Sequence, residues 1–599
     1  MATELVKGGE FIIKTSSADE VFTLEDLNEE QRMIRAAVKE FIDREVVPNH
    51  DRFEDHDYEL TQNLLQKAGE LGFLGVTLPE AYNGLEMGFS TSLLVTDYFS
   101  GATGSMATAY GAHTGIGTLP IALYGTAQQQ EKYLPKLATG QWIGAYCLTE
   151  PTAGSDANSG KTTATLSEDK KYYLLNGQKM WISNAGFAHT FIVFARIADD
   201  PYLSAFIVEY DKAHPNGIKL GKEEDKLGIH ASSTRQVFFQ NTKVPVENLL
   251  WARNKGFKIA MNILNIGRLK LGAACLDSQR RILGIATTYA NEREQFNTKI
   301  SSFQAIKGKL AQMATNAYVS ESAVYRLAKL IEDWTEVYQK EEQLQPQKAL
   351  LKAVEDFAVE CSLVKVFCSE AAQLASDEGI QIYGGMGYSK EAPLEAAWRD
   401  ARIPRIYEGT NEINRIHAVG MLLKKALKGE IDLLGVARKI QRTLPQPPQP
   451  NPAEDSSSFA QEKEVLSNLK KIFIAVAGNA VQQYQTDLEK QQHLVLNMAE
   501  ILIEIFMVES ALLRVEKQAG KKEETRIPMA MVQLKLYQAV EKVAQNAKEA
   551  ILSFASGEQQ RVLLEGLRHW TTYRTYPNSA ALKDAIADRV ITEGGYCFD

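Results

Sequence analysis

The sequence predicts a mainly α-helical protein that carries one β-rich insert and an extra helical domain at its C-terminal end. Apolar residues recur at helical spacing before residue 140 and after residue 253, whereas short β-rich runs occupy the stretch between them. A proline-rich segment, LPQPPQPNPAEDSSS at 444–458, separates off the last helical part. A chain of 599 residues is too long for one hydrophobic core, so several packed units are expected.

The first predicted unit is an N-terminal helical domain at 29–140, preceded by an extension at 1–28. Ile34, Val38 and Phe41 fall on one helical stripe, and similar spacing recurs in LTQNLLQKAGELGFLGV. Such one-sided stripes are typical of helices that pack against a core.

The second predicted unit is a middle β domain at 141–252. Its strands are read from IGAYCLTE, KYYLLNGQKMWIS, TFIVFARI and SAFIVEY. The pair Asn176-Gly177 predicts a hairpin turn between two strands, because both residues tolerate positive φ.

Helical periodicity returns in a bundle domain predicted at 253–435. Residues 436–458 are then predicted to be a linker, and residues 459–599 a C-terminal helical domain. No internal repeat is evident along the chain.

The most membrane-like segment is VLNMAEILIEIFMVESALL at 495–513. Glu500, Glu504 and Glu509 interrupt it at near-helical spacing, which predicts an amphipathic helix with one face in water. Packing in a core is favoured over membrane contact, because glutamates on the polar face do not attract anionic lipids.

Composition excludes several classes of function. The net charge of −9 and the pI of about 5.7 argue against general binding of nucleic acid. The five cysteines form no CxxC pair and no HExxH is present, so neither a disulfide framework nor a metal is predicted. The first 22 residues carry no targeting pattern, so the cytoplasm of a bacterium is expected, with loose membrane association as a further expectation.

Glu408, in RIPRIYEGTNEINR at 402–415, is the candidate catalytic residue. It directly follows Ile406 and Tyr407, and burial by such neighbours raises the pKa of a carboxyl group toward the range that a general base requires. By itself this carboxylate fits a helix cap equally well.

Other short sequence blocks indicate a function only when they are considered together. Trp181 in QKMWISN would, alone, be read as a core aromatic residue. Arg293 in REQFNTKI suits a diphosphate, because its guanidinium makes bidentate hydrogen bonds, although an exposed arginine is usually only solvated. QIYGGMGYS at 381–389 lacks the third glycine of a dinucleotide fingerprint and reads as a helix stop.

With YCLTEPTAGSD at 146–156, these blocks resemble the signature blocks of the acyl-CoA dehydrogenase family over about residues 25–430. The C-terminal extension, which ends in ALKDAIADRVITEGGY, is similar to the very-long-chain branch. The resemblance implies an N-terminal helical domain, a middle β-barrel domain and a C-terminal four-helix bundle. It also implies FAD as cofactor and a fatty acyl-CoA substrate, converted to trans-2-enoyl-CoA in β-oxidation.

The resemblance also implies residue roles. Glu408 would remove the pro-R α-proton while a hydride moves from the β-carbon to flavin N5. Gly267 stands where some branches carry the base instead, so Glu408 acts alone. The implied cofactor contacts are Tyr146, Leu148, Thr149, Ser155, Trp181, Ser183, Arg293, Gln295, Phe296, Gln304, Gln381, Ile382, Gly384, Gly385, Thr410 and Glu412. The implied substrate contacts are Ser155, Asn265, Arg268, Gly409, Gly111 and Ala112.

Two departures from the family pattern bear on these roles. Asn297 replaces the usual glycine in REQFNTKI, and asparagine tolerates the left-handed backbone that the turn needs. Gly111 and Ala112 replace bulkier residues that close the acyl pocket of medium-chain relatives, which favours long chains. Close helix packing is the alternative reason for small residues there.

The resemblance further implies electron-transfer flavoprotein as acceptor and a homodimer that shares FAD between subunits. The C-terminal domain would cover the surface that shorter members use for tetramers, and the similar branch binds membranes peripherally through this region. An acyl-CoA oxidase and a non-catalytic assembly or nucleic-acid-binding member of the same fold are the alternatives. The intact Glu408 and the net charge of −9 weigh against the second.

Overall fold

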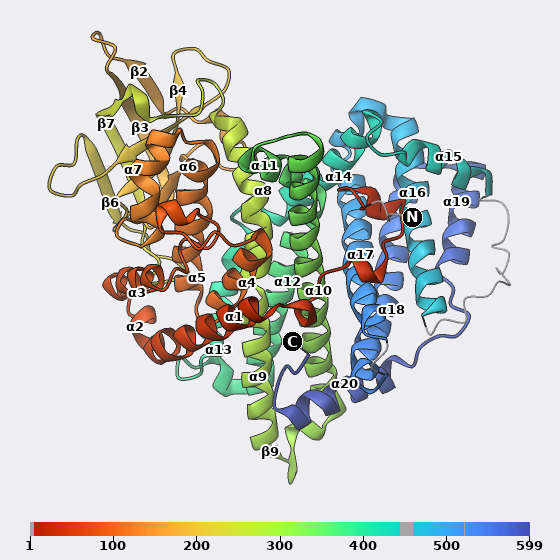
Figure 1. Ribbon diagram of the computed structural model, residues 1–599. Coiled ribbons are helices and arrows are strands. Elements are labelled where there is room, and N and C mark those ends of the chain that lie inside the picture. Colours follow the sequence, from red (N-terminus) through yellow and green to blue (C-terminus); the bar gives the residue numbers. More distant parts are fainter. Residues whose placement is uncertain (1–4, 444–458, 520–521, 599) are drawn as a thin grey trace.

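The computed structural model describes residues 5–443, 459–519 and 522–598 (Figure 1). A β domain stands at one side of a large helical body, and the C-terminal helices form the other side. The mainly α fold with a β insert and an extra helical domain is therefore confirmed. The proline-rich segment predicted at 444–458 lies outside the described residues.

The N-terminal helices form the layer beside the β domain. They are α1 (Glu29–Phe41), α2 (His50–Glu54), α3 (Tyr58–Glu70), α4 (Phe89–Phe99), α5 (Gly104–Gly111), α6 (Leu119–Tyr124) and α7 (Ala127–Ala138). Asn28 starts α1 by accepting a hydrogen bond from the backbone N–H of Gln31, as capping chemistry favours. Helices α5 and α6 are joined by a π-helical turn at Ala112–Thr118.

The middle domain is one eight-stranded sheet. Its strands are β1 (Gly144–Cys147), β2 (Thr163–Leu166), β3 (Tyr172–Ser183), β4 (Thr190–Ile197), β5 (Ser204–Glu209), β6 (Ile218–Glu223), β7 (Thr234–Pro245) and β8 (Leu249–Leu250). Their order is β6-β7-β3-β2-β4-β5-β8, and β1 lies parallel to β4. This sheet has its own hydrophobic core, separate from the core of the helical domains.

The predicted hairpin at Asn176-Gly177 is wrong. Strand β3 runs straight through both residues and pairs with β7 on either side of them. A register shift between Leu175 and Gly177 marks a β-bulge, which Gly177 fits with a φ of 153°. The glycine thus serves a bulge, because the chain on both sides of it finds the same partner strand.

The central bundle lies between the β domain and the C-terminal helices. Its helices are α8 (Gly256–Ala274), α9 (Leu276–Glu292), α10 (Gln304–Glu341), α11 (Pro346–Asp356), α12 (Ala358–Tyr383), α13 (Leu394–Arg402) and α14 (Asn411–Leu427). The helical stretch 256–292 is long and apolar enough to cross a membrane, but 78% of its apolar window is buried inside the protein, as in a core helix. Helix α15 (Leu433–Thr443) follows, so residues 436–443, predicted as linker, are helical.

The C-terminal helices pack directly on the bundle. They are α16 (Ala460–Tyr484), α17 (Gln492–Lys517), α18 (Lys522–Phe554), α19 (Gly557–Trp570) and α20 (Ser579–Glu593). Helix α17 contacts α10, α14 and α18 and shares their hydrophobic core.

The wet face predicted for the helix around 495–513 is wrong. Glu504 and Glu509 of α17 are each 2% exposed. Glu504 lies 2.6 Å from the Lys535 ammonium, and Glu509 lies 3.0 Å from the Arg326 guanidinium. Interhelical ion pairs therefore take the place of water, and the favoured role in core packing is confirmed.

The N-terminal extension is clamped between the bundle and the C-terminal helices (Figure 1). The ring of Phe11 packs edge-on against Phe506 of α17, at 5.1 Å between centroids. The indole of Trp334 in α10 donates to the Val6 carbonyl at 3.0 Å, and Glu25 pairs with Arg514 at 2.7 Å. The sequence pattern did not predict that the N-terminal extension packs between these helices.

Candidate active site

Glu408 sits in a strained turn between α13 and α14. Its φ is 56° and that of Gly409 is 79°, so two successive residues adopt the left-handed conformation. Glycine does this freely, but a glutamate seldom does, because its Cβ clashes with the backbone. Such strain persists only where surrounding contacts fix the backbone, and it concentrates at functional sites.

Two neighbouring helices hold this turn. The Asn414 amide of α14 donates to the carbonyl oxygens of Gly409 and Thr410, at 2.8 and 3.1 Å. The Lys365 ammonium of α12 donates to the Gly409 carbonyl at 2.8 Å, and the Thr410 hydroxyl accepts from the Ile413 N–H to cap α14. The backbone that carries Glu408 is thereby fixed before any ligand binds.

The Glu408 carboxyl group lies against Gly267 of α8. A Cβ added to Gly267 would stand 2.7 Å from Glu408 Oε2, closer than real Cβ contacts allow. Among the described residues, Oε2 finds no hydrogen-bond partner although it is buried. A bare helix backbone thus makes room for the carboxylate, which is left free to accept a proton.

Burial raises the pKa of Glu408 to about 7, against the opposing charges of Arg268 and Lys365. Burial likewise lowers the pKa of Lys365 to about 8, although Glu408 favours its charged form. A carboxyl group with a pKa near the working pH can accept and release protons, as a general base must. Desolvation, which the sequence predicts from Tyr407, is therefore the largest effect on the pKa of Glu408, whereas Ile406 is itself 47% exposed.

A second set of predicted residues gathers at the edge of the β domain. The Met180 N–H of β3 donates to the Thr149 carbonyl at 2.9 Å, which ties the loop after β1 to β3. The buried Lys179 ammonium bridges the Leu148 carbonyl and the Glu150 carboxylate, at 3.3 and 2.6 Å. Leu148, Thr149 and their loop are thus fixed in front of the β3 end that bears Trp181.

This edge presents groups that await a ligand. Trp181 is 52% exposed and has a φ of 60°, so it is not the core aromatic residue that it would be if read alone. The Tyr146 hydroxyl is buried and has no hydrogen-bond partner in the part of the chain that the structure describes, and burial together with Glu408 raises the pKa of Tyr146 well above its usual value. Ser183 ends β3, and Ser155 lies exposed in the loop after β1. An exposed ring beside unpaired polar atoms fits a planar, polar heterocycle.

The other predicted cofactor residues lie at the far end of the helical body (Figure 1). A small hairpin of β9 (Glu294–Gln295) and β10 (Thr298–Lys299) projects there, and Phe296 at its tip is 89% exposed. Asn297 has a φ of 56°, so the left-handed turn predicted for it is confirmed. The set at this end comprises Arg293, Gln295, Phe296, Gln304, Gln381, Ile382, Gly384 and Gly385.

The residues of this distant set differ in whether their side chains are accessible to a ligand. Gly384 ends α12 with a φ of 61°, as the helix-stop reading predicts. Ile382 is 3% exposed, so its side chain is closed to a ligand, and Gln304 already donates to Asp584 at 3.1 Å. From Gly267 to Arg293 the chain rises about 39 Å along α8 and α9. Within one chain, therefore, this set does not meet Glu408.

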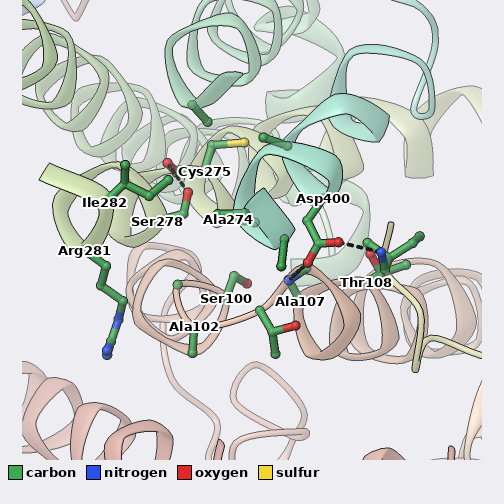
Figure 2. Close-up of a pocket in the computed structure, with 18 of the residues that line it drawn as sticks. Ser100, Ala102, Ala107, Thr108, Ala274, Cys275, Ser278, Arg281, Ile282 and Asp400 are labelled. Carbon is green, nitrogen blue, oxygen red and sulfur yellow. Dashed lines mark hydrogen bonds between the residues drawn. The ribbon is translucent and has the colours of Figure 1, made fainter. Parts of the chain in front are cut away.

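A cavity of about 410 Å³ lies along α8 and α9 (Figure 2). Gly267 faces Glu408, and Leu271, Ala274 and Ser278 continue the same helical face along the cavity wall. Ala107 of α5 also lines the cavity (Figure 2), as does Tyr407, the residue that precedes Glu408. The lining is mostly apolar, as an alkyl chain requires.

The small residues predicted to floor an acyl pocket lie on α5 and the π-helical turn. A Cβ added to Gly111 would meet nothing within 4 Å, so open space adjoins it. Ala112 is buried, 6% exposed. Open space supports the pocket reading for Gly111, whereas burial supports the packing alternative for Ala112.

Family models for acyl-CoA dehydrogenases match most of the chain. They describe the N-terminal domain at 28–141, the middle domain at 145–242, and a C-terminal domain at 254–421 and again at 468–569. A probable acyl-CoA dehydrogenase of Bacillus subtilis is 41% identical over 596 residues, which span 99% of this chain and 98% of that protein. The chain belongs to the acyl-CoA dehydrogenase family.

Two further relatives refine the comparison. The crystal structure of an acyl-CoA dehydrogenase complexed with FAD from Bacillus anthracis has a TM-score of 0.94 and 42% identity, over 99% of this chain and 100% of that one. The human mitochondrial very long-chain specific acyl-CoA dehydrogenase is 38% identical over 410 residues, 67% of this chain and 59% of that protein. The predicted enzyme class and the FAD cofactor of the family are thereby confirmed.

Two residues expected to contact the substrate lie buried in this acyl-CoA dehydrogenase. Asn265 and Arg268, expected to touch the CoA moiety, are only 4% and 3% exposed. The Arg268 guanidinium donates to Asn265 Oδ1 at 2.8 Å and contacts His417 Nδ1 at 3.2 Å. The charge of Arg268 also lowers the pKa of Glu408, and the contact of this pair with CoA stays a prediction.

Sequence reasoning missed the residues that hold the acyl-CoA dehydrogenase site together. Lys365 and Asn414 fix the Glu408 turn, and Lys179 with Glu150 fixes the loop at Thr149. The sequence feature that could have identified them is a charged or amide residue inside an otherwise apolar helix or strand. Glu412, in contrast, is exposed, and the pKa of its carboxyl is lowered by backbone hydrogen bonding at the start of α14.

Proposed function

We propose that this enzyme dehydrogenates long-chain acyl-CoA to trans-2-enoyl-CoA, with Glu408 as the base that removes the α-proton. The observation that carries this proposal is the buried carboxyl group of Glu408, held in a fixed turn with a pKa of about 7 and an unpaired oxygen. FAD, when bound, supplies the acceptor for the hydride that leaves the β-carbon.

The chain's own residues would act as follows. Thr149, Trp181, Ser183 and the Tyr146 hydroxyl hold the flavin ring at the β-domain edge. Glu408 accepts the α-proton on its unpaired oxygen, and its backbone N–H donates to the thioester oxygen to stabilise the enolate charge. Lys365 and Asn414 keep that N–H in place through the Gly409 carbonyl.

The apolar cavity supports a long acyl chain. Its wall extends from Leu271 to Ile285 along α8 and α9, about 21 Å of helix. The small residues Ala107 and Ala274 line this cavity, and open space adjoins Gly111 one turn further along α5. A medium-length chain would leave much of the apolar wall without contacts.

Chain-length preference is tested by anaerobic bleaching of the purified yellow protein. We expect the flavin to be reduced most efficiently by long acyl-CoAs, and efficiency to rise by about 0.8 kcal/mol, or 4-fold, per added methylene that the cavity buries. Butanoyl-, octanoyl-, dodecanoyl- and hexadecanoyl-CoA make a suitable series. A maximum at butanoyl-CoA, with no gain beyond it, would contradict the long-chain proposal.

The rate of flavin reduction is expected to depend on pH through Glu408. The base must be ionised, so kcat/KM should rise with pH through about 7 and level off above it. Lys365→Met removes a cation that lowers the pKa of Glu408, so its midpoint should move to higher pH. Lys365→Arg keeps the positive charge, so the midpoint of its pH profile should stay closer to that of the wild type. A midpoint that moves to lower pH in the methionine variant would refute this assignment.

We further propose that the enzyme acts as a homodimer and passes its electrons to electron-transfer flavoprotein. The set around Arg293 and Phe296 is exposed and lies far from Glu408, which fits a contact with the FAD of a partner subunit. Stoichiometric reoxidation by electron-transfer flavoprotein, with slow reoxidation by oxygen, would support this acceptor. Rapid turnover with oxygen would instead favour an oxidase.

A further inference from the structure

A second cavity, of about 400 Å³, lies on another face of α8. Apolar side chains of α6, α8 and α11 and of the loop before α4 line it, among them Leu119, Leu123, Ile266 and Leu350, whereas α10 contributes only polar residues. It shares no lining residue with the cavity that starts at Tyr407. Neither the reaction nor the proposed acyl path uses it.

Lys270 places an unpartnered charge in this second cavity. It lines the cavity and is 8% exposed, one helical turn from Ile266 on the same face of α8. Its stem packs on the π-helical turn, where a Cβ at Gly115 would stand 3.8 Å from Lys270 Cδ. Among the described residues, none accepts a hydrogen bond from its ammonium or pairs with it. Burial alone lowers the pKa of Lys270 to about 8.

The polar groups around Lys270 do not neutralise the charge of its ammonium group. His113 is near enough to feel its charge, but both ring nitrogens are engaged, with the Leu137 carbonyl at 2.9 Å and the Gly144 N–H at 3.0 Å. Glu332 and Glu336 lie on the α10 wall, where Glu332 accepts from the Ser90 hydroxyl at 2.5 Å. Neither glutamate acts on the pKa of Lys270. A buried ammonium without an anion costs free energy that a ligand would recover.

We propose that this cavity is a second ligand site, which binds a free long-chain carboxylic acid with its carboxylate on Lys270 and its alkyl chain along the apolar wall. The ammonium supplies the counter-charge, and Leu119, Leu123 and Leu350 supply contacts for the chain. Three glutamates, Glu86, Glu332 and Glu336, also line the cavity, and Lys270 is the one cationic side chain among the lining residues, so a negative head group fits only beside Lys270. This site is independent of the proposed reaction, since no residue is shared.

Binding of dodecanoate to the full-length holoenzyme tests the site by calorimetry. Ala107→Phe fills the first cavity, and this variant should still bind one equivalent of dodecanoate. Lys270→Met should weaken binding about 10-fold or more, because the charged hydrogen bond is lost. Lys258→Met, which removes an exposed lysine of the same helix, is the matched control and should bind as the wild type does. Dodecan-1-ol should bind far more weakly than dodecanoate.

A chemical readout keeps the test independent of the folding of any variant. In the wild type, dodecanoate should slow acetylation of Lys270 by an amine-reactive reagent and leave Lys258 unchanged, as measured by mass spectrometry. Unchanged labelling of Lys270, or equal affinity in Lys270→Met, would overturn the proposal. Loss of binding in Ala107→Phe alone would place the acid in the first cavity and overturn it as well.

Discussion

The Glu408→Gln variant is expected to bind FAD and acyl-CoA but to leave its flavin oxidised. Glutamine keeps the size of the side chain and can occupy the same left-handed turn, yet its amide does not accept the α-proton. A positioned general base contributes about 10²–10⁴-fold, so anaerobic reduction by hexadecanoyl-CoA should slow by about 10³-fold or more. Stopped-flow bleaching of the flavin measures this directly.

Two companion variants separate loss of the base from damage to the turn. Glu408→Asp keeps a carboxylate but draws it back by one methylene, so partial activity is expected. Gly267→Glu combined with Glu408→Gly brings a carboxylate to the same space from α8, since a Cβ at Gly267 would point at the present Glu408 Oε2, 2.7 Å away. Partial recovery in this double variant would support a role set by position. Wild-type bleaching in Glu408→Gln would remove the base assignment altogether.

The sequence predicted the parts of the fold that depend on local pattern. Helical stripes and β-rich runs located the layers, and the aromatic neighbour Tyr407 indicated a dry site for Glu408, whose pKa burial raises to about 7. The hairpin predicted at Asn176-Gly177 is wrong because turn propensity depends only on local sequence. The residues on both sides of this pair form hydrogen bonds with β7, which is distant in the sequence. The left-handed backbone predicted at Asn297 is confirmed, because tolerance of positive φ is a property of asparagine itself.

The contacts that hold the site were beyond local pattern. Lys365 reaches Gly409 across 44 positions, and Glu25 pairs with Arg514 across 489. Nothing in either neighbourhood signals its partner. The sequence predicts that Glu504 and Glu509 face water, because glutamate usually does, yet Lys535 and Arg326 from other helices pair with them. Burial of charge is decided by tertiary packing, and a single sequence does not display it.

The Ala107→Phe variant is expected to shift the acyl-CoA preference toward short chains. Ala107 lines the cavity from α5, so a phenyl ring there occupies the path of the alkyl chain (Figure 2). Excluding three or four methylenes, at about 0.8 kcal/mol each, removes about 3 kcal/mol. The kcat/KM for hexadecanoyl-CoA should therefore fall by about 100-fold.

The short substrate is the internal control for this variant. Butanoyl-CoA would reach Glu408 without passing Ala107, so its kcat/KM should change less than about 3-fold if the ring only blocks the distal cavity. Equal losses for both substrates would mean that the ring disturbs the turn or α5 itself. No loss for hexadecanoyl-CoA would mean that the chain follows another path. The ratio of the two constants, measured across the variants, therefore reports the path of the chain separately from the chemistry at Glu408.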